Sequence, residues 1–90
     1  MPVPTPAVGS AIMFSTSWCG YCKRLKSQMD REGILYTEVD IEGDPESATF
    51  VVDVNNGNQT VPTLLFADGS TATNPSIIEV RKRVAAQPGE

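Results

Sequence analysis

Two cysteines, Cys19 and Cys22, are the residues of this 90-residue chain whose type and spacing suit redox chemistry. They are its only cysteines, and they stand in the stretch WCGYC beside its only tryptophan. A bridge across two residues constrains the unfolded chain little: the chain-entropy model gives it about 2 kcal/mol, against about 3 kcal/mol for a fifteen-residue loop. The pair therefore indicates thiol chemistry rather than a structural crosslink.

Three uses of such a pair are open. Structural zinc takes four ligands, mostly Cys and His, and the chain has no histidine, so zinc would require a dimer or carboxylate ligands. The cysteines could instead be two small buried apolar side chains. That interpretation accounts for Cys22, on the apolar stripe of a predicted helix, but not for Cys19, which polar residues and glycine flank. The third use is thiol–disulfide exchange.

The predicted position of Cys19 favours exchange. It follows a strand and stands at the N-terminal end of a helix, where unpaired amides and the helix dipole stabilise a thiolate. Lys23, Arg24 and Lys26 add positive charge within two turns. A fall in thiol pKa from about 8.5 to about 6 would raise the thiolate fraction at pH 7 from about 3% to about 90%. Cys22 lies one turn inside and is expected to be less exposed and less ionised, so Cys19 attacks and Cys22 resolves.

The elements that must position the cysteines follow from hydrophobic periodicity and turn signals. Strands are predicted over residues 11–16, 35–41, 61–66 and 71–73, and helices over 20–32, 45–55 and 75–86. Asp44-Pro45 and Asn74-Pro75 are typical of a helix cap followed by proline. The second helix is expected to bury Phe50, Val51 and Val54 on one stripe. The order β-α-β-α-β-β-α predicts an α/β domain with a parallel first pair and an antiparallel hairpin, in a four-stranded mixed sheet flanked by three helices.

Length and composition limit the partners. The sequence predicts one domain over 11–86, a flexible N-terminal arm over 1–10 with three prolines, and a tail over 87–90. A net charge of −4 argues against a nucleic-acid partner. No apolar run approaches the ~20 residues of a membrane span. The N-terminus shows no export signal, so we expect a reducing cytoplasm, where a lone Cys-x-x-Cys is more often reactive than structural.

The basic residues are unevenly distributed. All seven fall in two clusters: Lys23, Arg24, Lys26 and Arg31, and then Arg81, Lys82 and Arg83. Between Gly33 and Val80 there are eight acidic residues and no basic one. The clusters are either two solvated helix faces or, for the first, a local positive field around Cys19.

Four segments together resemble a known superfamily: TSWCGYCKRLK, VDIEGD, TVPTLLFADGS and TNPS. A Cys-x-x-Cys between the first strand and helix, with Thr60-Val61-Pro62 about forty residues on, resembles the thioredoxin superfamily. The short length and the element order narrow the resemblance to glutaredoxin-like proteins, and most of all to the mycoredoxins of mycothiol-using bacteria. It covers roughly residues 11–84 and implies a thioredoxin-like (glutaredoxin) fold.

The resemblance implies a reaction. The Cys19 thiolate would attack a mixed disulfide between a protein and mycothiol, release the protein thiol and become S-mycothiolated. A second mycothiol would regenerate it, and a separate NADPH-dependent flavoenzyme would reduce the mycothiol disulfide. Cys22 is not essential on this monothiol route, although a dithiol route through a Cys19–Cys22 disulfide stays open. The implied partners are mycothiol, as co-substrate, and S-mycothiolated proteins; no bound cofactor is implied, and a monomer is expected.

Thr60, Val61 and Pro62 match the segment that carries a cis proline beside the active site of this superfamily. An X-Pro bond is cis in only about 5–6% of cases, so this expectation comes from the resemblance alone. In that geometry the Val61 backbone would face the sulfur and pair with the substrate's main chain. Pro62 has no amide hydrogen to bond elsewhere.

Thr73 and Asn74 match the place where glutaredoxins bind the carboxylate of their small thiol. A helix N-terminus with free amides suits that role, but Asn74 is equally well explained as a helix cap. Tyr21 is expected to be exposed and to border the thiol groove. Trp18 is expected to pack beside the Cys19 sulfur and shield it, because so bulky a side chain rarely stands on a loop without covering something.

Two departures separate this chain from glutathione-using glutaredoxins, which usually have Gly-Gly after the last strand and often Pro after the first cysteine. Here Asp68-Gly69-Ser70 and Gly20 stand instead. Gly20 also resembles glutaredoxins that share an iron–sulfur cluster across a dimer, so a cluster carrier is the non-enzymatic alternative; no metal ligands are assigned within one chain. The competing enzyme is a dithiol electron donor recycled by thioredoxin reductase, of the kind that supplies ribonucleotide reductase.

Overall fold

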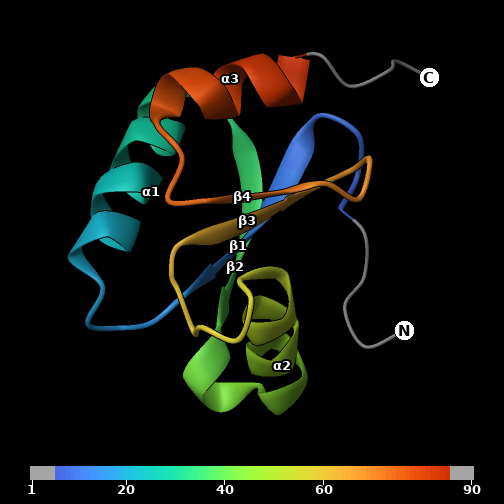
Figure 1. Cartoon of the computed structure of the whole chain (residues 1–90). Coiled ribbons are helices and arrows are strands. Elements are labelled where there is room, and N and C mark those ends of the chain that lie inside the picture. The colour runs from blue at the N-terminus through green and yellow to red at the C-terminus, as the bar shows by residue number, and fades with distance from the viewer. Residues whose placement is uncertain (1–5, 86–90) are drawn as a thin grey trace.

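The computed structural model describes residues 6–85, and within that range it has the predicted order of strands and helices (Figure 1). The strands are β1 (Ser10–Ser15), β2 (Leu35–Asp40), β3 (Thr63–Phe66) and β4 (Thr71–Thr73). The helices are α1 (Gly20–Glu32), α2 (Pro45–Val54) and α3 (Ile77–Ala85), with a short 3-10 turn, Ile41–Gly43, before α2. The predicted α/β class and the bounds of α1 are confirmed.

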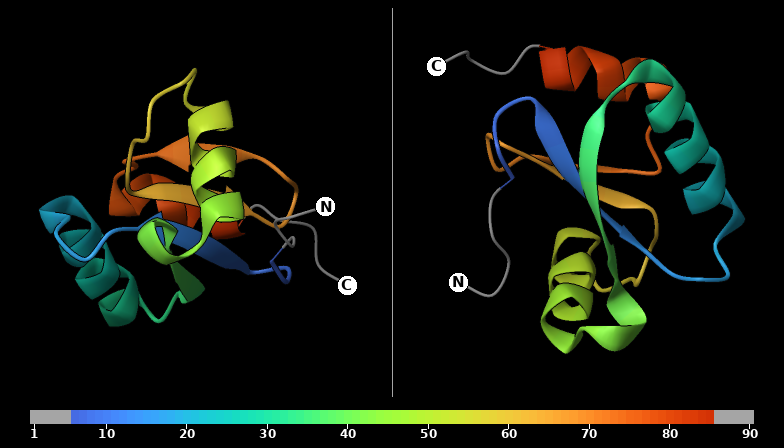
Figure 2. Two further views of the ribbon diagram at one scale, coloured as in Figure 1. Left: turned by 90° about the horizontal axis from the view of Figure 1, so that it is seen from below. Right: turned by 180° about the vertical axis from the view of Figure 1, so that it is seen from behind.

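The four strands form one mixed sheet in the order β2-β1-β3-β4. β1 runs parallel to β2 and antiparallel to β3, and β3 and β4 form the predicted hairpin. Helices α1 and α3 cover one face of the sheet and α2 covers the other (Figures 1 and 2). The domain therefore has three layers, and β1 lies inside the sheet with its C-terminal end at the loop that leads to Cys19.

Alternate residues of β1 face two apolar clusters, as the period of a strand requires. The first cluster, beneath α1 and α3, contains Ala11, Met13, Leu25, Met29, Leu64, Phe66, Ala72 and Val80. The second, beneath α2, contains Ile12, Phe14, Ile41, Val51 and Leu65. Burying one such large side chain contributes about 1.5–3 kcal/mol, so both faces of β1 fix the strand that delivers the chain to the cysteines.

Helix α1 begins and ends where its sequence indicates. Cys22, Leu25 and Met29 form its buried stripe. Gly33 ends it in the left-handed conformation, at φ 73°, and its amide donates to the carbonyls of Asp30 and Met29. A residue without a Cβ adopts that conformation at no steric cost.

The cap of α2 was predicted correctly, but its buried stripe only in part. Asp44 accepts a hydrogen bond from the Ser47 amide at 3.4 Å, with Pro45 in the first turn. Val51 is buried, whereas Val54 is 37% exposed and does not belong to the stripe as predicted. Ser47 is also buried, and its hydroxyl is satisfied because it donates to Asp44 at 3.0 Å.

The prediction that Asn74-Pro75 opens the last helix is wrong. Helix α3 begins at Ile77, and the Ser76 hydroxyl accepts from the Glu79 amide at 3.1 Å. Asn74 has a φ of 48°, and its amide donates to the Pro62 carbonyl at 2.7 Å. Asn74 therefore extends the contact between β3 and β4 instead of capping α3.

The ends of the chain are described only in part. Residues 1–5 of the predicted arm, the last residue of the predicted domain and the predicted tail lie outside the described residues. Ala7 accepts hydrogen bonds from both the amide and the hydroxyl of Ser10, in a turn that leads into β1. Over residues 6–85, no helix has the length and apolar character that crossing a membrane requires.

Arg83 ties α3 to the β3–β4 hairpin. Its guanidinium carbon lies 4.5 Å from the centroid of the Phe66 ring. Its nitrogens donate to the Ser70 hydroxyl at 2.5 Å and to the Thr71 carbonyl at 3.3 Å. A further pair with Glu79 lies within α3 at 3.3 Å. The cation therefore belongs to the packing of the domain as well as to its charged surface.

We predict that Arg83→Met lowers the free energy of unfolding by about 1–2 kcal/mol, because it removes a half-desolvated cation–π contact and two hydrogen bonds. The control is Arg81→Met, whose ion pair with Glu32 is exposed and is worth less than about 0.5 kcal/mol. Urea denaturation of both variants measures the difference. Equal losses would show that the Arg83 contacts add nothing to an ordinary surface pair.

Candidate active site at the start of helix α1

Cys19 is the N-cap of α1 and is joined to Cys22 by a disulfide bond. The two Cα atoms lie 5.3 Å apart. The Cys22 amide donates to the Cys19 sulfur at 3.1 Å, so the sulfur accepts from one of the amides that the first turn leaves unpaired. The predicted position of Cys19, after β1 and at the start of a helix, is confirmed.

The two cysteines differ in exposure in the predicted direction, but the difference is small. Cys19 is 5% exposed and Cys22 is 1% exposed. Cys19 is more enclosed than its polar and glycine neighbours indicated, because its side chain turns into the first helical turn toward Cys22. Only a small part of Cys19 is therefore open to a substrate sulfur.

The charge at the start of α1 is positive but smaller than predicted. The first turn contains no acidic residue, and Lys23 and Arg24 are exposed. Lys26 pairs with Glu38 at 3.0 Å, which offsets its charge. Among residues 6–85 no carboxylate forms an ion pair with Lys23 or Arg24. These two cations and the helix dipole are the features at the start of α1 that would favour a thiolate at Cys19 once the disulfide is reduced.

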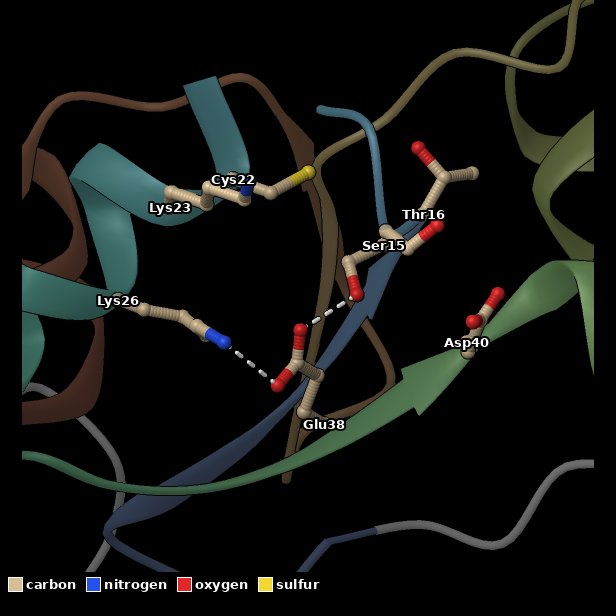
Figure 3. Close-up of a pocket in the computed structure, with 8 residues that line it drawn as sticks. Ser15, Thr16, Cys22, Lys23, Lys26, Glu38 and Asp40 are labelled. Atoms are coloured by element: carbon tan, nitrogen blue, oxygen red, sulfur yellow. Dashed lines mark hydrogen bonds and ion pairs between the residues drawn. The ribbon is translucent and has the colours of Figure 1, made fainter. Parts of the chain in front are cut away.

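Behind Cys22 is a polar pocket of about 330 Å³ between α1 and the ends of β1 and β2 (Figure 3). Glu38 lies at its centre and accepts from Lys26 at 3.0 Å and from the Ser15 hydroxyl at 2.7 Å. The Ser15 hydrogen bond lowers the pKa of Glu38 below its ordinary 4.5; burial opposes this, and Lys26 adds to the lowering. Thr16 also lines the pocket.

Sequence reasoning missed this pocket. Ser15 and Glu38 were predicted only as strand residues, although the alternation of LYTEVDI shows that β2 carries carboxylates on one face. What was missing is the parallel register, which pairs Met13 with Glu38 and Ser15 with Asp40 and so brings Ser15 beside Glu38. That register becomes known only from the folded sheet.

A second pocket, of about 310 Å³, lies between α1 and the start of α3. Tyr21, predicted to border the thiol groove, and Asn74, predicted at the place that binds the carboxylate of the small thiol, line it together with Arg24 and Ser76. The Tyr21 side chain is 64% exposed, as predicted. The Asn74 amide is not free to bind a carboxylate, because it donates to Pro62.

The prediction that Trp18 covers the Cys19 sulfur is wrong. Trp18 is 69% exposed. Its indole N–H donates to Glu42, in the turn before α2, at 2.9 Å, which directs the ring toward α2. Trp18 and Tyr21 are thus two exposed aromatic side chains on either side of Cys19 along the chain.

The two other predicted segments meet at the end of the sheet next to the cysteines. The Val61–Pro62 peptide bond is cis, as predicted, and Pro62 is buried. The β1–β3 register pairs Phe14 with Thr63, so Pro62 lies beside the end of β1. Thr63 pairs in turn with Thr73, and residues 60–62 and 73–74 therefore lie side by side.

Metal ligands do not gather in the described part of the chain. Within residues 6–85 no three side chains of His, Cys, Asp or Glu are grouped so that they could hold a metal ion. A cluster shared between two chains is a different arrangement, to which this finding does not apply.

Comparison with known proteins identifies the family. A model of the glutaredoxin family matches residues 11–70, which include both cysteines and Pro62. The chain belongs to the glutaredoxin family. Over 77 residues it is 53% identical to a Mycobacterium tuberculosis protein classed with the glutaredoxins, covering 86% of this chain and 92% of that protein. Over 79 residues it is 37% identical to mycoredoxin 1 of Corynebacterium glutamicum, covering 88% and 98%.

Solved structures agree on the fold. The glutaredoxin of Methanosarcina mazei superposes with a TM-score of 0.70 at 20% identity, over 91% of this chain and 84% of that one. The glutaredoxin of Archaeoglobus fulgidus gives 0.68 at 20% identity, over 83% and 85%. The predicted thioredoxin-like (glutaredoxin) fold is confirmed. The chain is thus a glutaredoxin-family thiol–disulfide oxidoreductase with a Cys-x-x-Cys active site, in a family that uses a small thiol as co-substrate.

We predict that Glu38 stabilises the fold in a pH-dependent way. A carboxylate whose pKa is lowered on folding contributes stability above its unfolded pKa, here 4.5, and loses it as pH falls through the folded pKa. Wild type should exceed Glu38→Gln in unfolding free energy at about pH 6, and the difference should shrink toward about pH 3. Ser15→Ala removes the hydrogen bond that lowers the pKa of Glu38 most, so it should weaken the pH dependence of the unfolding free energy. A difference that stays constant across this range would contradict the assignment.

Proposed function

We propose that this protein removes mycothiol from protein mixed disulfides by a monothiol reaction at Cys19. The observation that carries the proposal is the position of the Cys19 sulfur, which caps α1 and accepts from the Cys22 amide. A first turn without acidic residues adds to it. A thiolate at that position is stabilised and is the attacking form of cysteine.

The reaction is two exchanges at sulfur. The Cys19 thiolate attacks the mycothiol sulfur of the mixed disulfide, forms a new S–S bond to it and expels the protein thiolate, which takes a proton from solvent. A second mycothiol, as thiolate, attacks the S-mycothiolated Cys19 and leaves as mycothiol disulfide. Cys19 is then a thiolate again; the protein thiol has been released at the expense of one free mycothiol, which has become half of the mycothiol disulfide. A separate NADPH-dependent flavoenzyme reduces the mycothiol disulfide.

Two lines of support favour mycothiol over glutathione. The 37% identity with mycoredoxin 1 extends over nearly the whole of that protein. The chain also has Gly20 where glutathione-using glutaredoxins often have Pro, and Asp68-Gly69-Ser70 where they usually have Gly-Gly. The proposal places the reaction in a reducing cytoplasm and in a monomer.

The proposed thiol-binding groove lies between the cysteines and the two loops beside them. Thr60, Val61 and Pro62 form its floor, and the Val61 backbone is the proposed partner of the substrate's main chain. Thr73 is the last residue of β4, and the amide of the next residue, Asn74, donates to the Pro62 carbonyl.

The pocket shared by Tyr21, Arg24 and Asn74 is the proposed site for the part of the small thiol beyond its sulfur. The Asn74 side chain and the Arg24 guanidinium are among the polar groups that line it. Trp18, exposed on the other side of Cys19, is the proposed contact for the protein half of the mixed disulfide.

One observation favours a second candidate, the dithiol electron donor recycled by thioredoxin reductase. Cys19 and Cys22 are bonded to each other, which is the state that a dithiol route leaves behind. Cys22 is less exposed than Cys19, so the Cys19 sulfur is the more accessible end of that bond for a reductase.

An assay that couples NADPH oxidation to disulfide reduction tests both candidates. With an S-mycothiolated protein, mycothiol and the mycothiol disulfide reductase, wild type should consume NADPH, and Cys22→Ser should stay within about threefold of it. Cys19→Ser should fall to background, because a serine hydroxyl is not ionised at neutral pH. Serine is also a good N-cap, so a folding defect would not explain that loss.

The same assay with thioredoxin reductase in place of mycothiol and its reductase is the second arm. We expect little NADPH oxidation there. Equal loss of activity in Cys19→Ser and Cys22→Ser would contradict the monothiol reaction. Faster turnover with thioredoxin reductase than with mycothiol would favour the dithiol donor.

A further inference from the structure

Asn55, the residue that ends α2, makes three side-chain hydrogen bonds to three different elements. Its Nδ2 donates to the Val51 carbonyl of α2 at 2.8 Å and to the Thr63 hydroxyl of β3 at 3.0 Å. Its Oδ1 accepts from the Thr73 hydroxyl of β4 at 2.6 Å. The sequence indicated only that a helix ends here, so nothing in the pattern distinguished Asn55 from its neighbours.

The two threonines lead directly to the two loops of the proposed groove. The Thr63 hydroxyl in turn donates a hydrogen bond to the Thr60 carbonyl at 2.8 Å, on the other side of the cis Pro62. Thr73 precedes Asn74, whose amide bonds to the Pro62 carbonyl at 2.7 Å. A chain of hydrogen bonds thus runs from one loop through Asn55 to the other, and one direct backbone bond closes it.

The donors and acceptors around Asn55 match only one orientation of its side-chain amide. Both N–H groups of Asn55 are used, by Val51 and by Thr63, and its oxygen is used by Thr73. Rotating the amide by half a turn would place its oxygen against the Val51 carbonyl, where two acceptors repel. Asp at this position would bring the same repulsion. A residue with two donors and one acceptor on a short side chain is what the geometry requires, and that is asparagine.

We propose that Asn55 is a positioning residue that sets the spacing between loops 60–62 and 73–74, and through it the fit of the small thiol beside Cys19. The inference rests on the proposed assignment of these loops to thiol binding. The hydrogen bonds of the Asn55 side chain reach α2, β3 and β4 but not α1. Asn55 therefore acts on substrate binding and leaves the ionisation of Cys19 unchanged.

Kinetics of four variants test the proposal. Asn55→Ala and Thr73→Val should each raise the KM for the disulfide substrate about tenfold, with kcat within about twofold of wild type. Both variants remove the hydrogen bond between Asn55 and Thr73. The KM of the double variant should therefore be little higher than that of the worse single variant, whereas independent sites would raise it about a hundredfold. Asn58→Ala is the control, since its side chain bonds only to the exposed Asn55 carbonyl, and its KM should be unchanged.

One more variant and one pH profile complete the kinetic test. Asn55→Asp keeps the acceptor for Thr73 but places a carboxylate oxygen against the Val51 carbonyl, so it should not restore the wild-type KM; a wild-type KM in Asn55→Asp would contradict the proposal. The pH profile of Cys19 alkylation should be the same in Asn55→Ala as in wild type. A KM unchanged in Asn55→Ala, or a shifted alkylation profile, would overturn the proposal.

Amide hydrogen exchange tests the coupling of the two segments without any substrate, so its result does not depend on which thiol the protein uses. In Asn55→Ala, exchange of the Asn74 amide should be at least about tenfold faster than in wild type, while amides in the middle of α1 keep their rates. Unchanged exchange at Asn74 would contradict the coupling of the loops, whichever thiol the enzyme uses. If exchange responds as expected but wild type fails to use mycothiol, the proposed function is wrong and the coupling of the loops stands.

Discussion

The first turn of α1 leaves amides without partners, and the Cys19 sulfur is the acceptor that meets one of them. In most helices a serine, threonine or aspartate takes that place. Here the capping atom is also the reactive atom, so the stability of the helix start and the charge on the sulfur depend on each other. Ionising Cys19 makes it a better acceptor for the Cys22 amide, and a negative charge there is favoured by the helix dipole. The rest of the fold can be understood as what keeps this sulfur at this position.

That position is held from both sides of the sheet. β1 is buried on its α1–α3 face and on its α2 face, so the strand that leads to Cys19 has little freedom. The stripe of Cys22, Leu25 and Met29 holds α1 to the same core. The loop between them is therefore fixed at both ends. The proposed groove is bounded by two segments whose contacts pass through Pro62 and Asn55, on elements far from Cys19 in the chain. In this proposal the nucleophile and its binding surface are held by separate elements.

The sequence was informative wherever a local rule decides the structure. The bounds of α1, its glycine stop and the Asp44 cap follow from residues within one turn of each other. It was misleading where a distant partner competes with the local signal. Asparagine often caps helices, but the Asn74 amide donates to the Pro62 carbonyl, and Ser76 caps α3 instead. Trp18 bonds to Glu42, 24 residues away, and Glu38 bonds to Ser15, 23 residues away. Such contacts depend on strand register, which no spacing within one segment reveals. The cis geometry before Pro62 came only from resemblance to a family.

The central claim is that Cys19 is ionised at neutral pH because of the helix start and the two free cations beside it. Its most direct test is the pH dependence of alkylation in two variants, Cys22→Ser, which leaves Cys19 alone, and Cys19→Ser, which leaves Cys22 alone. The account predicts an apparent pKa for Cys19 below about 7 and a clearly higher one for Cys22. Values near 8.5 for both thiols would show that the start of α1 does not activate the sulfur, and would contradict the account.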